Sequence, residues 1–201
     1  MRVFINGFGR IGRSVLRAWA QGVAPAVQVV GINDIAAADM CAYLFEFDSV
    51  FGPWRGEVGL SGGGLVVDGR TIALHRTSDI STLNLTGVDV VLECTGRADT
   101  KEVAERGLRA GARRVLISGP SQAADLTVVL GANDGDLGQQ AIVSNASCTT
   151  NALAPLAKLI QRNWGIVTGS MTTIHCYTGS QPTVDAPAAD FARSRAAALS
   201  M

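Results

Sequence analysis

The chain begins with a short apolar stretch that runs directly into a glycine-rich turn. Residues 2–6 (Arg-Val-Phe-Ile-Asn) have the composition of a buried strand, and residues 7–12 read Gly-Phe-Gly-Arg-Ile-Gly. The G-x-G-x-x-G pattern is informative where it follows a strand and opens a helix, and an apolar face over residues 11–19 predicts that helix. This order constrains the chain to begin with a dinucleotide-binding βαβ unit.

An acidic residue at the expected spacing supports this interpretation. A second apolar stretch, residues 27–32, ends in Asn33-Asp34, and Asp34 follows Gly12 by about 20 residues. At that spacing a carboxylate meets the ribose hydroxyls, while the pyrophosphate lies on the helix N-terminus. The alternatives are an ordinary glycine-rich turn and, for Asp34, an aspartate that caps a turn. The cofactor-binding candidates here are Gly7, Phe8, Gly9, Arg10, Ile11, Gly12, Asn33 and Asp34.

Composition narrows the class of protein. The chain has 201 residues, of which 47% are hydrophobic, and 17 basic residues balance 17 acidic ones. This balance argues against a nucleic acid or an anionic membrane as partner, and no apolar run reaches the roughly 18 residues of a membrane span. The four cysteines form no C-x-x-C pair or obvious disulfide framework, which suits a reduced setting. We expect a cytoplasmic protein without a metal site.

The alternation of strand and helix patterns predicts an α/β fold, a Rossmann-type doubly wound and mostly parallel sheet, followed by an incomplete α+β domain. Asp68-Gly69 between two apolar stretches predicts a hairpin. Ligands of such sheets bind beyond the carboxyl ends of strands, where Asp34, Thr95, Gly96 and Ser118 fall. The expected further strands are 65–67, 71–74, 88–92, 115–117, 127–130 and 141–143, and the expected helices are 37–47 and 101–110.

Cys148 has the surroundings of a reactive thiol. It precedes an apolar run over residues 152–160, which predicts a helix beginning at the cysteine. The N–H groups and the dipole of a helix N-terminus would stabilise the thiolate, the nucleophilic form. His175, at the end of an expected strand over residues 166–175, would accept a proton if the fold brings it close. The alternatives are an inert buried thiol and a packed histidine.

Five motifs together resemble the phosphorylating glyceraldehyde-3-phosphate dehydrogenase family. They are Asn-Gly-Phe-Gly-Arg-Ile-Gly-Arg, Asn-Asp, Glu-Cys-Thr-Gly-Arg, Ser-Asn-Ala-Ser-Cys-Thr-Thr-Asn and His-Cys-Tyr-Thr-Gly. The resemblance implies Cys148 as nucleophile and His175 as general base. It also implies two sets of binding residues: Arg10, Ile11, Asp34, Arg76, Thr95, Gly96 and Ser118 around NAD, and Ser147, Thr149, Thr178 and Arg193 around the substrate phosphate and inorganic phosphate.

The implied activity is the NAD-dependent oxidative phosphorylation of glyceraldehyde 3-phosphate to 1,3-bisphosphoglycerate, a glycolytic oxidoreductase reaction with a thioester intermediate. Two alternatives stay open: an erythrose-4-phosphate dehydrogenase, and a truncated, non-catalytic NAD-binding relative. One departure bears on the phosphate site, because the family usually has aspartate where this chain has Ser180.

The resemblance also predicts the domain organisation. We expect an NAD-binding domain over residues 1–147 and the N-terminal part of a truncated catalytic domain over residues 148–201, since the family continues beyond this point. On that basis we expect the 201 residues alone to be inactive. The stretch 179–199 resembles a loop that packs between subunits, which implies a homotetramer for the full-length protein.

Overall fold

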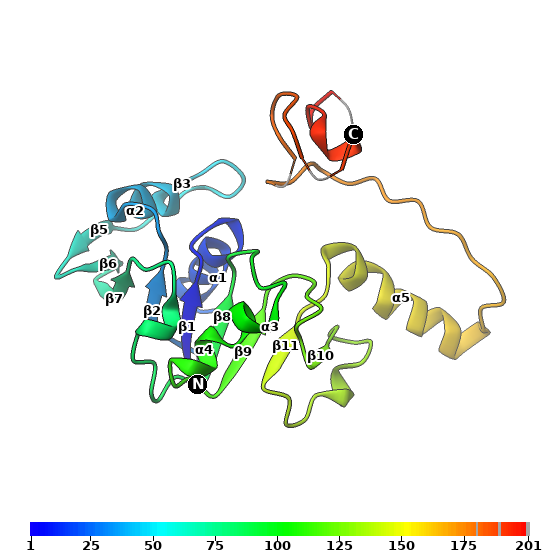
Figure 1. The fold of residues 1–201 in the computed structure, drawn as a ribbon, viewed down its shortest axis with the longest axis horizontal. Helices are drawn as coiled ribbons and strands as arrows, with labels where there is room; N and C mark the ends of the chain where they lie inside the picture. Colours follow the sequence, from blue (N-terminus) through cyan, green and yellow to red (C-terminus); the bar gives the residue numbers. More distant parts are fainter. Residues whose placement is uncertain (180, 189, 200–201) are drawn as a thin grey trace. The chain divides into compact units, whose positions relative to one another are not determined.

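The computed structural model describes residues 1–179, 181–188 and 190–199, which form two compact units. The first unit covers residues 1–163 and contains the sheet and its helices, and the second begins at Trp164 (Figure 1). Each unit is described by itself below. The predicted boundary after Ser147 separates a cofactor-binding from a catalytic domain, which is a different division from that into compact units, and it stays a prediction.

A nine-stranded sheet of mostly parallel strands forms the first unit within the described residues, in the order β10-β11-β9-β8-β1-β2-β7-β6-β5. The strands from β10 to β7 pair in parallel, and β6 and β5 complete one edge in antiparallel pairing. The predicted α/β class is confirmed. The parallel strands are β1 (Arg2–Asn6), β2 (Gln28–Asn33), β7 (Arg70–His75), β8 (Val90–Glu93), β9 (Arg114–Ile117), β10 (Leu126–Thr127) and β11 (Ile142–Ser144).

The strand order reverses at β1, which pairs with β2 on one side and with β8 on the other. In open α/β sheets a crevice forms beyond the carboxyl ends of the strands at such a switch point. Helix α1 (Arg10–Ala20) follows β1 there, and α2 (Ala38–Glu46) follows β2. The topology therefore places the glycine-rich turn and Asp34 at the same edge of the sheet.

The core lies on both faces of the sheet. Phe4 and Ile5, neighbours on β1, are buried in two different hydrophobic clusters because successive strand side chains point to opposite faces. The Phe4 cluster includes Val91, Val115 and Ala104, whereas the Ile5 cluster includes residues of α1 and α2. A sheet covered on both faces explains why its strands are apolar runs rather than alternating patterns.

The predicted hairpin is present between β6 (Gly64–Val67) and β7, where Val67 pairs with Arg70 across Asp68-Gly69. Both turn residues have positive φ, +48° and +75°, as a type I′ turn requires. The structure adds three strands that the sequence did not predict: β3 (Phe47–Asp48), β4 (Gly52–Pro53) and β5 (Val58–Ser61). These are short antiparallel partners, and two of them are too short to show a periodicity.

Three predicted elements differ from the structure. The helix expected over 101–110 is divided into α3 (Lys101–Ala104) and α4 (Arg106–Arg109), although Glu105 keeps helical dihedrals of −78° and −9°. The strand expected over 127–130 is reduced to β10. The stretch 166–175 forms no strand in the described parts of the chain: a strand needs a neighbour for its hydrogen bonds, and no described strand pairs with this stretch.

Helix α5 (Cys148–Trp164) begins at the cysteine, as predicted, and continues as helix through Pro155.

In the second unit a 3-10 turn, η3 (Ala192–Ser194), lies next to the buried Ala197, whose N–H donates to the Pro182 carbonyl at 2.9 Å. Arg195 pairs with Asp185 at 3.1 Å. The short 3-10 turns of the first unit are η1 (Ile80–Thr82) and η2 (Asp134–Asp136).

Replacing Phe45 tests the packing of α2 against the sheet. Phe45 is fully buried and its ring contacts those of Phe8 and Trp54. We expect Phe45→Ala to lower the free energy of unfolding by about 3–5 kcal/mol, because it leaves a cavity in the core. Tyr43→Ala on the same helix, at an exposed position, is the control and should cost less than about 1 kcal/mol. Urea denaturation measures both; equal losses would contradict this account of the core.

Candidate functional site

The glycine-rich turn allows two close approaches of backbone. Gly7 has φ +91°, and a Cβ there would lie 2.7 Å from the backbone of Cys94 and Thr95. A Cβ on Gly12 would lie 2.1 Å from the Gly7 carbonyl oxygen, so α1 can pack against the turn only with glycine at that position. Gly9, the residue before α1, has open space around its Cβ position. The turn therefore leaves room for a ligand at the helix N-terminus, as pyrophosphate binding requires.

Asp34 lies directly after β2 and its carboxylate is held by backbone N–H groups. One oxygen accepts from Phe8 at 2.6 Å and the other from Ala36 at 2.9 Å. Each carboxylate oxygen can accept more than one hydrogen bond, so the group can still bind ribose hydroxyls. The glycine turn and this carboxylate together fit the adenosine and pyrophosphate of a dinucleotide.

A buried polar network lies beneath the turn. Glu93 accepts from the Asn6 side chain at 2.5 Å, and Asn6 accepts from the Asn33 side chain at 2.8 Å. Asn33 in turn accepts from the Thr77 N–H at 2.9 Å, and Glu93 accepts from the Thr95 N–H at 3.0 Å. These contacts join the carboxyl ends of β1, β2 and β8 and the loop after β7. The sequence signal for Asn6 and Glu93, a polar residue ending each strand, was present but was not used for the prediction.

Two arginines predicted around NAD have protein partners in the structure. Arg10 pairs with the buried carboxylate of Asp48. Desolvation opposes ionisation of Asp48, but the N–H groups of Phe51 and Val50 and the Arg10 guanidinium outweigh it and lower the pKa of that carboxyl. Arg76 is exposed after β7, and its guanidinium lies 3.4 Å from the Ile35 carbonyl, beside Asp34 in sequence. Arg10 can serve the cofactor through its backbone N–H at the start of α1, whereas contact by its side chain stays a prediction.

Two cavities follow the carboxyl edge of the sheet. The first, of about 310 Å³, is lined by Gly7, Gly9 and Asp34 among others. The second, of about 430 Å³, is lined by Ile11, Ser118 and Cys148 among others. Cys94 lines both. An extended ligand that has its adenosine in the first cavity can therefore reach the second, where Cys148 lies.

Cys148 is exposed at the first position of α5. The Ser147 hydroxyl caps the helix: its oxygen accepts from the Thr150 N–H at 3.0 Å and lies 3.1 Å from the Thr149 hydroxyl. The preceding Ala146 is buried with φ +58°, a left-handed conformation that side chains adopt rarely and that is found at functional sites. The local backbone thus presents the thiol at a helix N-terminus, while the predicted phosphate roles of Ser147 and Thr149 stay predictions.

The other thiols of the first unit differ from Cys148. Burial raises the pKa of Cys94 to about 11, and burial raises the pKa of Cys41 to about 11 as well. Thr95 and Gly96 are exposed after β8, and the Ser118 N–H donates to the Glu93 carbonyl at 3.0 Å. Thus Thr95, Gly96 and Ser118 lie at strand ends, as predicted.

The second unit contains His175, Thr178 and Arg193. The His175 ring contacts the Cys176 carbonyl, and the Thr178 N–H donates to the Gln181 side chain at 3.0 Å. Arg193 is exposed within η3. Ser180, the departure from the family pattern, lies outside the described residues. The predicted association of these residues with Cys148 stays a prediction.

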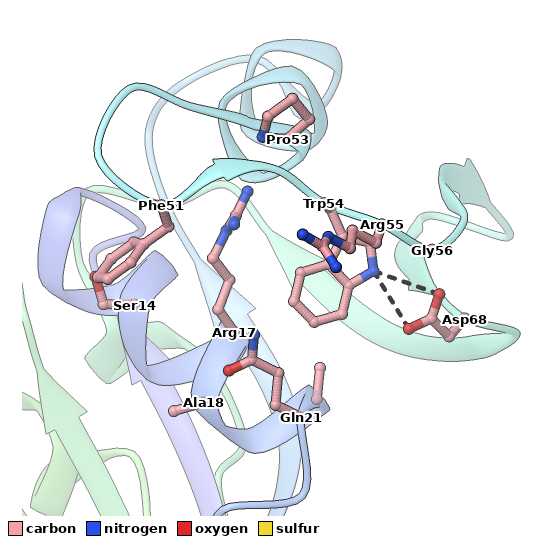
Figure 2. A pocket seen from close by; sticks show the side chains of 11 residues that line it. Ser14, Arg17, Ala18, Gln21, Phe51, Pro53, Trp54, Arg55, Gly56 and Asp68 are labelled. Atoms are coloured by element: carbon pink, nitrogen blue, oxygen red, sulfur yellow. Dashed lines mark hydrogen bonds between the residues drawn. The ribbon is translucent and has the colours of Figure 1, made fainter.

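A further cavity of about 610 Å³ lies beside the second half of α1 and contains none of the predicted residues. Figure 2 shows Arg17 between Phe51 and Trp54, and the Trp54 indole donating to Asp68. Arg17 is buried and donates to the Phe45 and Glu46 carbonyls at the end of α2. A cation there stabilises the helix C-terminus, so Arg17 has a structural role.

Within the described residues, no group of three or more His, Cys, Asp or Glu side chains could hold a metal ion. In the same part of the chain, no helix has the length and apolarity needed to cross a membrane.

The fold and the two cavities define a dinucleotide-binding protein of the Rossmann class. Comparison with known proteins identifies the family. The profile described as "Glyceraldehyde 3-phosphate dehydrogenase, NAD binding domain" matches residues 1–101, and the C-terminal domain profile of that family matches residues 147–201. The chain belongs to the glyceraldehyde-3-phosphate dehydrogenase family and carries its NAD-binding domain.

Individual relatives of similar sequence are named glyceraldehyde-3-phosphate dehydrogenase. Glyceraldehyde-3-phosphate dehydrogenase of Xanthobacter flavus is 48% identical over 205 residues, and that of Geobacillus stearothermophilus is 45% identical over 205 residues. The alignments cover 100% of this chain and 61% of each relative. The chain thus spans about three fifths of the length of these curated relatives.

Two glycine variants separate ligand binding from folding. Gly9→Ala adds a methyl group to open space, so we expect unchanged stability but at least tenfold weaker NAD binding, because the methyl group meets the pyrophosphate. Gly12→Ala places the methyl group on the Gly7 carbonyl and should instead lower the unfolding midpoint. Calorimetric titration and thermal unfolding measure these effects. Full NAD affinity in Gly9→Ala would refute the assigned pyrophosphate position.

Thiol alkylation tests the contrast among the cysteines. Only the thiolate reacts, so pKa values of about 11 keep Cys41 and Cys94 protonated at neutral pH. We expect iodoacetamide at pH 7.5 to modify the exposed Cys148 and Cys176 in the folded protein, and Cys41 and Cys94 only after unfolding. Peptide mass spectrometry measures the four rates, with denatured protein as the control. Equal rates for Cys94 and Cys148 in the folded protein would contradict the assignment.

Proposed function

We propose that the full-length protein catalyses the NAD-dependent oxidative phosphorylation of glyceraldehyde 3-phosphate to 1,3-bisphosphoglycerate. The observation that carries this proposal is the exposed Cys148 thiol at the N-terminus of α5, in the cavity that Ile11 and Ser118 also line. A nucleophile beside the predicted cofactor path is the arrangement that oxidation of a covalently bound aldehyde requires. The names of the similar proteins support the same substrate.

The proposed cofactor residues fit NAD. Gly9 leaves open space at the start of α1, and Asp34 offers carboxylate oxygens in the lining of the same cavity. Backbone N–H groups at the α1 N-terminus would bind the pyrophosphate, and Asp34 would bind the ribose hydroxyls. NAD, when bound, supplies the acceptor for the hydride.

In the proposed reaction the Cys148 thiolate adds to the aldehyde carbon and gives a thiohemiacetal. His175, as general base, takes the proton of the hemiacetal hydroxyl as the carbon is oxidised, which leaves a thioester on Cys148. Inorganic phosphate then attacks the thioester carbonyl, forms the acyl phosphate and releases the thiolate. Ser147, Thr149, Thr178 and Arg193 are the proposed ligands of the substrate phosphate and the attacking phosphate.

The proposal includes the cellular location and the oligomeric state of the protein. A thiol nucleophile has to stay reduced, which agrees with a cytoplasmic setting. The resemblance of residues 179–199 to an intersubunit loop supports a homotetramer of the full-length protein. Sedimentation velocity of the full-length protein measures the oligomeric state.

The activity test uses one substitution and one matched control. We expect the full-length protein to produce NADH from glyceraldehyde 3-phosphate only with inorganic phosphate, and Cys148→Ser to reduce kcat by at least 10³-fold, since the hydroxyl is a much weaker nucleophile. Cys41→Ala, which removes a buried thiol outside the Cys148 cavity, should retain activity.

Absorbance at 340 nm follows the reaction, and erythrose 4-phosphate is assayed in parallel. Faster turnover of erythrose 4-phosphate than of glyceraldehyde 3-phosphate would identify erythrose 4-phosphate as the substrate instead. Undiminished activity of Cys148→Ser would overturn the proposed nucleophile.

A further inference from the structure

The first of the two cavities extends beyond Asp34. With the pyrophosphate at the start of α1 and the ribose at Asp34, the base of a dinucleotide lies on the far side of the ribose. There the lining comes from three segments, and none of the lining residues named here is a predicted site residue: Thr77 and Ser78 after β7, Ile80 of η1, and Val103 and Arg106 of the helical segment. With the adenosine placed as proposed, this end of the cavity is where its adenine would lie.

Arg106, the first residue of α4, is the charged group of this wall that is partly buried, with 25% of its side chain exposed. One terminal nitrogen donates to the Ser78 carbonyl at 3.2 Å. Its Nε lies 3.5 Å from a carboxylate oxygen of Asp79 but is buried and hydrogen-bonds no atom of the described residues. The buried Nε is not accessible to a ligand, but the two terminal nitrogens carry four N–H groups, and only one of these has an acceptor among the described protein atoms.

The chemistry of adenine matches this unused capacity. The ring nitrogens of adenine accept hydrogen bonds, and a guanidinium only donates them, from a rigid planar fork. Ile80 and Val103 offer apolar side chains in the same lining for the faces of the ring. Asp34 beside the ribose disfavours a 2′-phosphate, so the cavity suits NAD rather than NADP.

We propose that Arg106 is a specificity-determining residue of the cofactor site, which donates from its guanidinium to a ring nitrogen of the adenine of NAD. This inference rests on the proposed placement of the adenosine at Asp34. It adds a contact from a helix that neither the glycine motif nor the strand ends indicate.

A purely structural role makes a different prediction. Arg106 also links α4 to the loop before η1 through Ser78 and Asp79, and the Asp79 carboxylate is held independently by the Ser81 N–H at 2.9 Å. If Arg106 acted only by holding that loop, weakening its ion pair with Asp79 would have the same effect on ligand binding as removing the guanidinium. Asp79→Asn weakens that pair but leaves the donors of Arg106 in place.

The experiment measures binding of ADP-ribose, which contains the adenosine end of NAD and undergoes no oxidation. Calorimetric titration of the full-length protein compares Arg106→Met with Arg109→Met. Arg109 lies on the same helix, contacts Glu105 and the Glu102 carbonyl, and does not line the cavity. We expect a Kd at least tenfold higher for Arg106→Met, and a change of less than twofold for Arg109→Met.

Further arms identify the cause. Asp79→Asn should change the Kd of ADP-ribose by less than threefold, and nicotinamide mononucleotide should bind Arg106→Met as it binds the unmodified protein. Arg106→Lys keeps the positive charge but not the planar fork of donors, so its Kd for ADP-ribose should fall between those of the unmodified protein and Arg106→Met. It also provides the test if the methionine variant does not fold.

Unchanged ADP-ribose binding by Arg106→Met, or an equal loss in Asp79→Asn, would overturn the proposal. Because this binding needs neither Cys148 nor a substrate, its failure is distinguishable from failure of the proposed activity.

Discussion

The hydrogen bond between the buried Glu93 carboxylate and the Asn6 amide joins the ends of the two central strands. Asn6 in turn binds Asn33, so the carboxyl ends of β8, β1 and β2 are held in one register. All three side chains are buried, and a buried polar group that loses its partner costs about 1–3 kcal/mol. The glycine turn and Asp34 directly follow Asn6 and Asn33, and Thr95 lies two residues after Glu93. Their relative positions therefore depend on the network beneath them.

The two cavities lie at the strand ends that this network holds, and a cysteine lines each of them. Cys94 lines both cavities, and its raised pKa of about 11 keeps it an uncharged thiol between the cavity proposed for the adenosine and the cavity that contains Cys148. Cys148 differs by position rather than by residue type, because it is exposed at the capped N-terminus of α5. The same side chain is thus inert in one place and a proposed nucleophile about 50 residues later.

Periodicity and turn chemistry predicted much of the fold. The strand–glycine–helix opening, the Asp68-Gly69 hairpin and the start of α5 at Cys148 follow from local patterns, and the structure confirms them. The two-residue strands β3 and β4 and the break at Glu105 carry no such pattern. The stretch 166–175 has the composition of a strand, but composition supplies no partner.

The candidate site likewise contains residues that the sequence predicts and residues that it does not. Asp34, Thr95 and Ser118 were predictable because strand ends converge at one edge of a parallel sheet. Arg106 was not, since an arginine on a helix has the same sequence signal whether it faces solvent or a cavity. The proposed partnership of His175 with Cys148 involves residues of two different units, and it rests on the resemblance to the family.

The central claim is that Cys148 forms a covalent acyl intermediate, and rapid quenching tests it most directly. The full-length protein is mixed with NAD and glyceraldehyde 3-phosphate in the absence of inorganic phosphate, quenched in acid and digested for mass spectrometry. The account predicts a 3-phosphoglyceroyl thioester on the peptide that contains Cys148, which disappears when phosphate is added before quenching. An adduct on another residue, or NADH formation in a single turnover without any adduct, would contradict it.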